Sequence, residues 1–152
     1  MYSLQVARAI CYLHGKSLVH RDIAARNVLV STPKCVKLTD FGLSRALDYD
    51  AIYTGGKKIA TMDRLAGVCV WEILSWGAKP WQGVPNADVI TRVEAGTRLP
   101  CPDSCPIALY NYLELIVWAL QPAKRPAAKE IVSVMESIHD QLKKHVPPKE
   151  IH

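Results

Sequence analysis

The chain has 152 residues, a length that suits one domain with one hydrophobic core. Hydrophobic residues make up 49% and charged residues 22%, so the composition is that of a globular protein and excludes a disordered one. The net charge of +5 is mild and no block of five basic residues occurs, so nucleic-acid binding is not indicated, whereas anionic substrates and acidic peptides stay open.

The N-terminal third alternates between helix and strand patterns. Residues 3–14 are expected to form an amphipathic helix that Ser3 caps and Gly15 ends. A short strand is expected at 18–20, and a hairpin is expected from two strands joined by a Ser-Thr-Pro-Lys turn, at 27–30 and 35–38. Residues 40–60 are polar and contain two adjacent glycines, which predicts a loop.

The remainder is predicted to be mostly helical. An apolar helix without a polar face is expected at 65–75, which implies burial on most sides. A second helix should begin near Asn86 and end at Gly96, with three inward side chains: Val89, Ile90 and Val93. Loops are expected at 79–87 and 99–106, and further helices at 107–120 and 127–143.

Cysteine usage and hydropathy bear on the compartment. The five cysteines are odd in number, which favours free thiols in a reducing compartment. The segment CPDSCP (101–106) has the wrong spacing for a CxxC metal site and is followed by no second ligand pair. The most apolar run, 66–76, is too short to span a bilayer and carries Glu72, so we expect a cytoplasmic protein without membrane insertion.

The stretch LVHRDIAARNVLV (18–30) places a polar cluster between two apolar runs. Asp22 and Asn27 lie in this loop, and Asp40 follows the second strand of the hairpin. Since a hairpin brings its two ends together, the three oxygen-bearing side chains are expected to face one point. Such hard ligands suit Mg²⁺, and a carboxylate that is not a ligand can accept a hydroxyl proton. The alternative is that they are turn residues that satisfy local backbone groups.

The motif HRDIAARN (20–27), followed by DFG eighteen residues after Asp22, resembles the catalytic and metal loops of protein kinases. The AARN ending resembles tyrosine kinases. The segments YSLQ, CVKLTDFGLSR, GVCVWEILSWGAKPWQGVPNADVI and RLPCPDSCP together resemble the focal adhesion kinase family of non-receptor tyrosine kinases. The resemblance covers about residues 2–142.

The resemblance implies a role for each matching residue. Asp22 corresponds to the catalytic base, and Arg26 to the arginine near the base and the substrate hydroxyl. Asn27 and Asp40 correspond to the magnesium ligands that hold ATP. Tyr53 sits at an activation-loop phosphorylation position, with Tyr49 a looser match, and an ordinary loop tyrosine is the alternative. Four residues correspond to structural parts of the two loops: His20, Arg21, Phe41 and Gly42.

The sequence departs from the kinase pattern in two places. It contains no Gly-rich loop, strand lysine or partner glutamate, so an N-terminal lobe is absent from these residues. Near 58–66 the substrate-binding loop and A-P-E motif are missing, and Asp63 is one position out of register with the aspartate that braces the catalytic loop. Arg125 thereby lacks its usual glutamate, and we expect it to be exposed or to pair with another carboxylate.

The expected fold is therefore mainly α: a kinase-like C-terminal lobe over 2–142 with a small β-hairpin, an internal deletion near 58–66 and a tail at 143–152. Two functions are open. The chain is either a truncated protein-tyrosine kinase catalytic domain that uses ATP and Mg²⁺, or an inactive kinase fragment that binds proteins. The expected partners are a protein substrate or regulatory protein, with docking to a full-length kinase as a further option.

Overall fold

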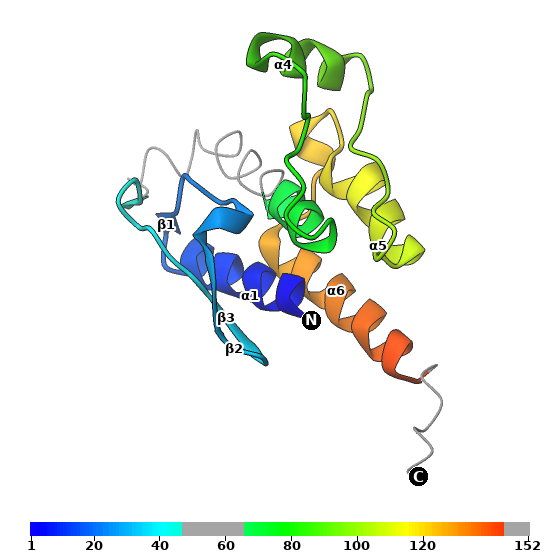
Figure 1. Ribbon diagram of the computed structural model, residues 1–152. Coiled ribbons are helices and arrows are strands. Elements are labelled where there is room, and N and C mark those ends of the chain that lie inside the picture. The colour runs from blue at the N-terminus through cyan, green and yellow to red at the C-terminus, as the bar shows by residue number, and fades with distance from the viewer. Residues whose placement is uncertain (47–65, 145–152) are drawn as a thin grey trace.

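The structure is a computed structural model that describes residues 1–46 and 66–144. Helices dominate it, and short antiparallel strand pairs cover one side of the first helix (Figure 1). The mainly α fold with a small hairpin is thus confirmed. Among the described residues no helix is long and apolar enough to cross a membrane.

Helix α1 (Tyr2–Gly15) buries one apolar face. Val6, Ile10 and Leu13 are all buried, as their spacing predicts. The expectation that Ser3 caps the helix is wrong, because the helix begins at Tyr2 and Met1 occupies the cap position. Ser3 is instead fully buried inside the first turn, where no side-chain cap is formed.

The hairpin consists of β2 (Val28–Thr32) and β3 (Cys35–Leu38), with Val28 opposite Leu38 and an irregularity between Val30 and Thr32. Both strands were predicted, although β2 begins one residue later than expected. Gln5 of α1 anchors the hairpin: its Nε2 donates to the Lys34 carbonyl at 2.8 Å and its Oε1 accepts from the Val36 amide at 2.9 Å. The hairpin is therefore fixed on α1.

A second strand pair joins the short strand predicted at 18–20 to a strand within the region 40–60, which was predicted as a loop. Strand β1 (Leu18–Val19) pairs with β4 (Arg45–Ala46), and Val19 stands opposite Arg45. The pair closes the chain from the end of α1 to residue 46 into one unit, which contains both of the expected site loops.

Residues 66–74 are helical and lie at the centre of the molecule. They contribute to both hydrophobic clusters of the structure. The larger cluster joins this segment to α1 and the C-terminal helices: Leu4, Ala7, Val70, Trp71, Leu99, Leu109, Leu113, Val117, Trp118, Ile131, Met135 and Ile138. The smaller cluster joins it to α1 and the site loops: Val6, Ile10, Val19, Ile23, Val36, Ala66 and Cys69.

Gly67 permits this central packing. A Cβ atom at Gly67 would lie 2.6 Å from Trp118 Nε1 and 2.9 Å from Val117 Cγ1. Real Cβ atoms do not approach other atoms so closely, so the segment packs against the C-terminal helices only because residue 67 has no side chain.

The C-terminal half contains α4 (Asn86–Glu94), α5 (Ile107–Tyr112), a π-helical turn η2 (Leu113–Val117) and α6 (Ala128–Lys144). Helix α6 packs beside α1 (Figure 1). One expectation fails in α4: Val93 is buried, but Ile90 is 65% exposed. The apolar face of α4 borders an open cavity rather than closed core, so its middle position remains in contact with solvent.

Candidate active site

The loop after β1 is organised around the Asp22 carboxylate. Asn27 lies in the 3-10 turn η1 (Ala25–Asn27), where its Nδ2 donates to the Asp22 carbonyl at 2.8 Å and to Asp22 Oδ2 at 2.9 Å. Arg26, in the same turn, donates to Asp22 Oδ1. Each carboxylate oxygen of Asp22 therefore has a donor that comes from four or five residues further along the chain.

His20 ties this loop to the loop that follows β3. Its ring is fully buried, and Nδ1 accepts from the Asp22 amide at 3.3 Å. Nε2 must then carry the proton, and it donates to the Thr39 carbonyl at 2.8 Å. The Phe41 ring meets the His20 ring edge-on, with centroids 4.8 Å apart. One imidazole thus fixes the backbone on both sides of the site.

The hairpin brings Asp40 next to Asn27. The Asn27 carbonyl accepts from the Thr39 amide at 2.8 Å and from Thr39 Oγ1 at 3.0 Å. Asp40 follows directly, is exposed, and accepts from the Gly42 amide through Oδ1 at 3.4 Å. The structure therefore places Asn27 and the residue before Asp40 in direct contact, as the position of the hairpin predicts.

Two site residues have left-handed backbone conformations. Arg21 has φ of 69° and Asp40 has φ of 60°, and neither is glycine. Such a conformation costs on the order of 1 kcal/mol for an ordinary residue, so the hydrogen bonds around it must offset that cost. Here His20, Asn27 and Thr39 supply those bonds.

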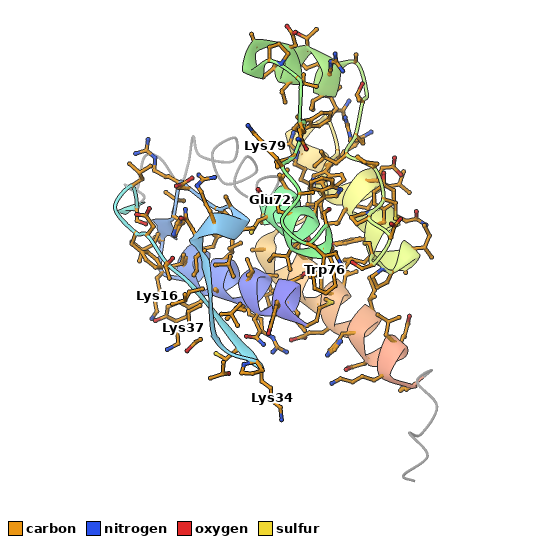
Figure 2. The ribbon with its side chains drawn as sticks, viewed as in Figure 1. Lys16, Lys34, Lys37, Glu72, Trp76 and Lys79 are labelled. Atoms are coloured by element: carbon orange, nitrogen blue, oxygen red, sulfur yellow. The ribbon has the colours of Figure 1, made fainter. Side chains whose placement is uncertain are left out.

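Glu72 is a site residue that sequence reasoning missed. Its Oε2 accepts from the Ala25 amide at 2.8 Å, so the helical segment 66–74 holds the first residue of η1 (Figure 2). A signal was present, because Glu72 is the single charge in the apolar run 66–76. The aspartate suspected of a bracing role, Asp63, lies outside the described residues.

A thiol lies one helical turn from Glu72. Cys69 is fully buried, and this burial, with the Glu72 carboxylate as the second cause, raises the pKa of Cys69 to about 12. The thiol is therefore protonated near neutral pH and does not serve as a nucleophile there.

The residues predicted for the catalytic and metal loops thus form one connected group, while the two candidate phosphorylation sites, Tyr53 and Tyr49, lie outside the described residues. Arg125, for which an exposed or carboxylate-paired position was expected, is half-buried. It donates to the carbonyls of Ala119 at 2.7 Å and Leu120 at 3.1 Å.

Comparison with known proteins gives the family. The family model described as protein tyrosine and serine/threonine kinase matches residues 1–64 and 65–135. This chain belongs to that kinase family.

Among three similar proteins, two are named as tyrosine-protein kinases and the third as a receptor. The inactive tyrosine-protein kinase kin-32 of Caenorhabditis elegans is 46% identical over 99% of this chain and 20% of that protein. The epidermal growth factor receptor of Apis mellifera is 40% identical over 84% of this chain and 11% of its own length. The melanoma receptor tyrosine-protein kinase of Xiphophorus maculatus is 38% identical over 86% of this chain and 13% of its own length. The chain thus spans a tenth to a fifth of these proteins.

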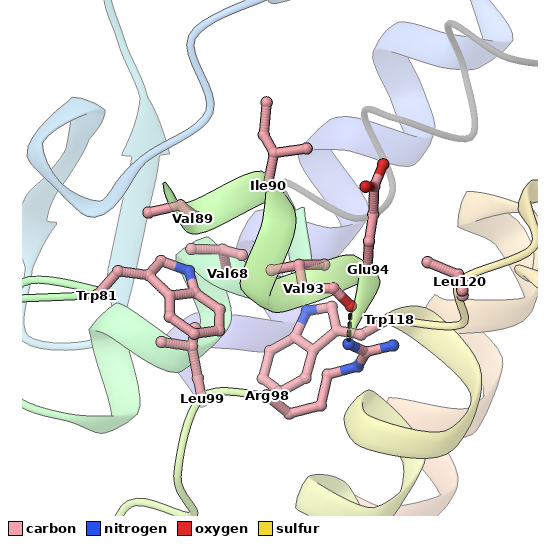
Figure 3. A pocket seen from close by; sticks show the side chains of 10 residues that line it. All are labelled: Val68, Trp81, Val89, Ile90, Val93, Glu94, Arg98, Leu99, Trp118 and Leu120. Atoms are coloured by element: carbon pink, nitrogen blue, oxygen red, sulfur yellow. Dashed lines mark hydrogen bonds between the residues drawn. The ribbon is translucent and has the colours of Figure 1, made fainter. Parts of the chain in front are cut away.

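This kinase-family chain also has an apolar cavity of about 590 Å³ that the catalytic loop does not line. It lies between α4, the helical segment 66–74 and the residues that follow η2, with Trp81 and Trp118 on its walls (Figure 3). Arg98 borders it and donates to the Val93 carbonyl at 2.9 Å. Ile90 stands at the border of this space and is exposed, so α4 is incompletely buried.

Proposed function

We propose that this chain is the C-terminal lobe of a protein-tyrosine kinase catalytic domain of the focal adhesion kinase type, with Asp22 as the base that accepts the proton of a protein tyrosine. The observation that carries the proposal is the position of Asp22, whose carboxylate is held by Arg26 and Asn27. A catalytic base needs such fixed orientation before it can align a hydroxyl.

The order of residues supports tyrosine rather than serine or threonine as the acceptor. Arg26 lies four residues after the base and is 67% exposed at its side chain, so the guanidinium stands at the open edge of the site. A planar cation in this position suits the approach of a phenolic hydroxyl. The two relatives named as tyrosine-protein kinases support the same acceptor.

Asn27 and Asp40 fit a magnesium ion by the chemistry of their donor atoms. The side-chain nitrogen of Asn27 donates to Asp22, which leaves the side-chain oxygen Oδ1 as the atom that can bind a metal ion. Asp40 adds an exposed carboxylate. Both are hard oxygen donors of the kind that Mg²⁺ takes. The ion, when bound with ATP, neutralises phosphate charge.

Manganese tests the metal site without an activity assay. Paramagnetic Mn²⁺ should broaden the NMR signals of Asn27 and Asp40 before those of other described residues. Asp40→Asn should abolish the selective effect, while Asp88→Asn, on the distant helix α4, should leave it unchanged. Equal broadening in the wild type and in Asp40→Asn would contradict the site.

These 152 residues are proposed to be insufficient for phosphate transfer. Asp22, Asn27 and Asp40 orient a hydroxyl and a cation, but in-line transfer also requires groups that fix the triphosphate, and no Gly-rich loop or strand lysine occurs in this sequence. We expect no transfer to a generic tyrosine polymer above the level of an Asp22→Asn control. Transfer that appears in the wild type and vanishes in the variant would overturn this expectation.

An internal deletion near 58–66 belongs to the proposal. The family model matches in two segments that meet at residues 64 and 65. The alignment with kin-32 has 169 positions, so at least 17 of them have no residue in this chain. Both findings support the loss of part of the substrate platform. Sequencing of the transcript across this junction tests the proposed deletion. A transcript that encodes the uninterrupted family sequence at this position would contradict it.

The second candidate function is a catalytically inactive module that binds a regulatory protein or a full-length kinase. The similarity to kin-32, which is named an inactive tyrosine-protein kinase, favours it. Calorimetry with Mg·ATP separates the two functions: weak binding that Asp40→Asn removes favours a catalytic lobe, and no binding favours the inactive module.

We also propose Tyr53 as a site phosphorylated in trans by an intact kinase of this family, in a cytoplasmic setting. Strand β4 ends at Ala46, seven residues before Tyr53, and its pairing places the backbone of Arg45 opposite Val19, close to Arg21 in the chain. Two basic residues near this point support recognition of a phosphate. Peptide mass spectrometry of wild type, Tyr53→Phe and Tyr49→Phe tests the assignment, and modification that survives Tyr53→Phe would refute it.

A further inference from the structure

We propose that Cys101 and Cys105 are a reversible modification site that forms an intramolecular disulfide when a hydroperoxide oxidises Cys101. The two residues belong to the loop 99–106, which the kinase chemistry does not use. Nothing in the proposed catalytic mechanism depends on either thiol.

A tight turn brings the two cysteines together. The Cys105 amide donates to the Pro102 carbonyl at 2.9 Å, which closes the chain into a four-residue turn. The Cys101 thiol lies 3.7 Å from the same Pro102 oxygen. The Cys105 backbone amide and the Cys101 side chain therefore meet at one carbonyl. The Cys105 thiol lies 3.5 Å from the Pro106 carbonyl oxygen, and its interactions with Cys101 contribute to its raised pKa, so the two thiols are neighbours, as an S–S bond requires.

Hydrogen bonds from outside the turn hold the loop in this shape. Trp71 Nε1 donates to the Pro100 carbonyl at 2.7 Å, and the Tyr110 hydroxyl donates to the Leu99 carbonyl at 2.8 Å. Ser104 Oγ donates to the Leu74 carbonyl on the other side of the turn. With both ends of the loop fixed, the thiols keep their relative position, which raises their effective concentration for each other.

The two thiols differ in exposure, and this assigns their roles. Cys101 is exposed and borders a surface cavity of about 530 Å³, so a small peroxide reaches its sulfur. Cys105 is half-buried, and burial, followed by interactions with Cys101, raises the pKa of its thiol to about 11. Cys101 is therefore the attacking thiol and Cys105 the resolving thiol.

The reaction balances in two steps. The Cys101 thiolate attacks one peroxide oxygen, the O–O bond breaks, and the product is a sulfenic acid and an alcohol or water. The Cys105 thiolate then attacks the Cys101 sulfur, the S–O bond breaks and hydroxide leaves as water. The peroxide is reduced by two electrons, which the two thiols supply, and thiols such as glutathione restore the reduced pair.

A metal site is the competing use of two cysteines. Among residues 1–46 and 66–144 no group of three or more His, Cys, Asp or Glu side chains is arranged to hold a metal ion. The pair thus lacks the further ligands that a tetrahedral zinc site needs.

Peroxide treatment of the folded chain, followed by alkylation and tryptic mass spectrometry, locates the bond. Cys101 and Cys105 share one tryptic peptide, residues 99–124, whereas Cys11, Cys35 and Cys69 fall in others. We expect that peptide to lose two hydrogens and to take up no alkylating reagent. Alkylation of both its cysteines, or a bond from either one to another peptide, would refute the proposal.

Two variants test the roles of the thiols. In Cys105→Ser the first step occurs and the second cannot, so dimedone should trap a sulfenic acid at Cys101. Cys101→Ser should show no oxidation of Cys105 at the same peroxide dose. Cys35→Ser is the matched control, because Cys35 is also half-buried, and its disulfide yield at 101–105 should equal that of the wild type.

A glutathione redox buffer tests the geometry. If the turn holds the thiols in place, the equilibrium constant for the disulfide should be at least about tenfold larger in the native chain than in guanidinium. An equal or smaller native constant would show that the fold does not favour the bond.

Discussion

The loops 20–27 and 99–106 both form hydrogen bonds with the same helical segment, 66–74, which holds them on different sides. Glu72 accepts from the Ala25 amide on one side. Its neighbour in sequence, Trp71, donates to the Pro100 carbonyl on the other. Adjacent residues on a helix point in different directions, so one turn is enough to fix two loops.

The two loops differ in where their hydrogen bonds end. In loop 20–27 they end on functional side chains, since Asn27 and Arg26 both donate to the Asp22 carboxylate. In loop 99–106 they end on backbone carbonyls, and the side chains of Cys101 and Cys105 interact only locally. The first arrangement orients a charged group, whereas the second shapes the backbone and leaves its thiols available for reaction.

The largest effect is expected for His20→Ala. The substitution removes a fully buried ring and leaves the Thr39 carbonyl and the Asp22 amide without their partner. A cavity and two unpaired polar groups together should lower the free energy of unfolding by about 2–4 kcal/mol. Urea denaturation measures the change.

Phe41→Leu is the control for His20→Ala. It removes the ring contact with His20 but keeps both imidazole hydrogen bonds, and Phe41 is 48% exposed, so the loss should stay below about 1 kcal/mol. If the two variants lose equal stability, the hydrogen bonds of His20 are not what joins the two loops.

Glu72→Ala should rank second. It removes the carboxylate that accepts from the Ala25 amide, at an expected cost of about 1.5–3 kcal/mol for a charge-assisted bond. Glu72→Gln keeps an oxygen acceptor and should lose less than half as much. The pair is compared by urea denaturation, and equal losses would mean that the negative charge of Glu72, rather than its oxygen acceptor or its packing, accounts for the loss.

The contrast between the loops also explains what the sequence could reveal. Asp22, Asn27 and Asp40 were predicted because their types and spacing are those of a known chemistry, and the hairpin strands were predicted from their apolar runs. Glu72 was missed because a brace needs only an acceptor at the right place, and many residues at many spacings provide one. The proximity of the two thiols likewise depends on a turn that Trp71, from another part of the chain, holds in place.

Ile90 shows the limit of periodicity. Its spacing with Val89 and Val93 predicts a buried position, but Ile90 is exposed at the border of an open cavity. A helical pattern gives the direction of a side chain and not what fills the space opposite it. That depends on residues distant in the chain.

The stability of the region around Cys69 and Glu72 should depend on pH in the alkaline range. The pKa of Cys69 is raised to about 12 in the folded chain, against a usual value of 9.0, so the unfolded chain loses this proton first. The contribution of the Cys69 thiol to the free energy of unfolding is therefore complete below pH 9. It is lost as the pH rises toward 12, and the free energy of unfolding then falls by up to about 1.4 kcal/mol per pH unit. Unfolding of the wild type and Cys69→Ala at pH 8 and pH 10 checks this. The free energy of unfolding should fall by about 1 kcal/mol less in Cys69→Ala than in the wild type between these two pH values. Equal decreases would contradict a raised pKa for Cys69.

The smallest effect is expected at Ser104, which holds the second loop to the Leu74 carbonyl. Ser104 is exposed, so water replaces its hydrogen bond, and Ser104→Ala should cost about 0.5–1 kcal/mol. Combining Ser104→Ala with Glu72→Gln asks whether the helical segment transmits strain between the loops. The two residues contact different loops, so their effects on the free energy of unfolding should add to within about 0.5 kcal/mol. A larger coupling, measured by a double-mutant cycle in urea, would show that residues 66–74 respond as one unit.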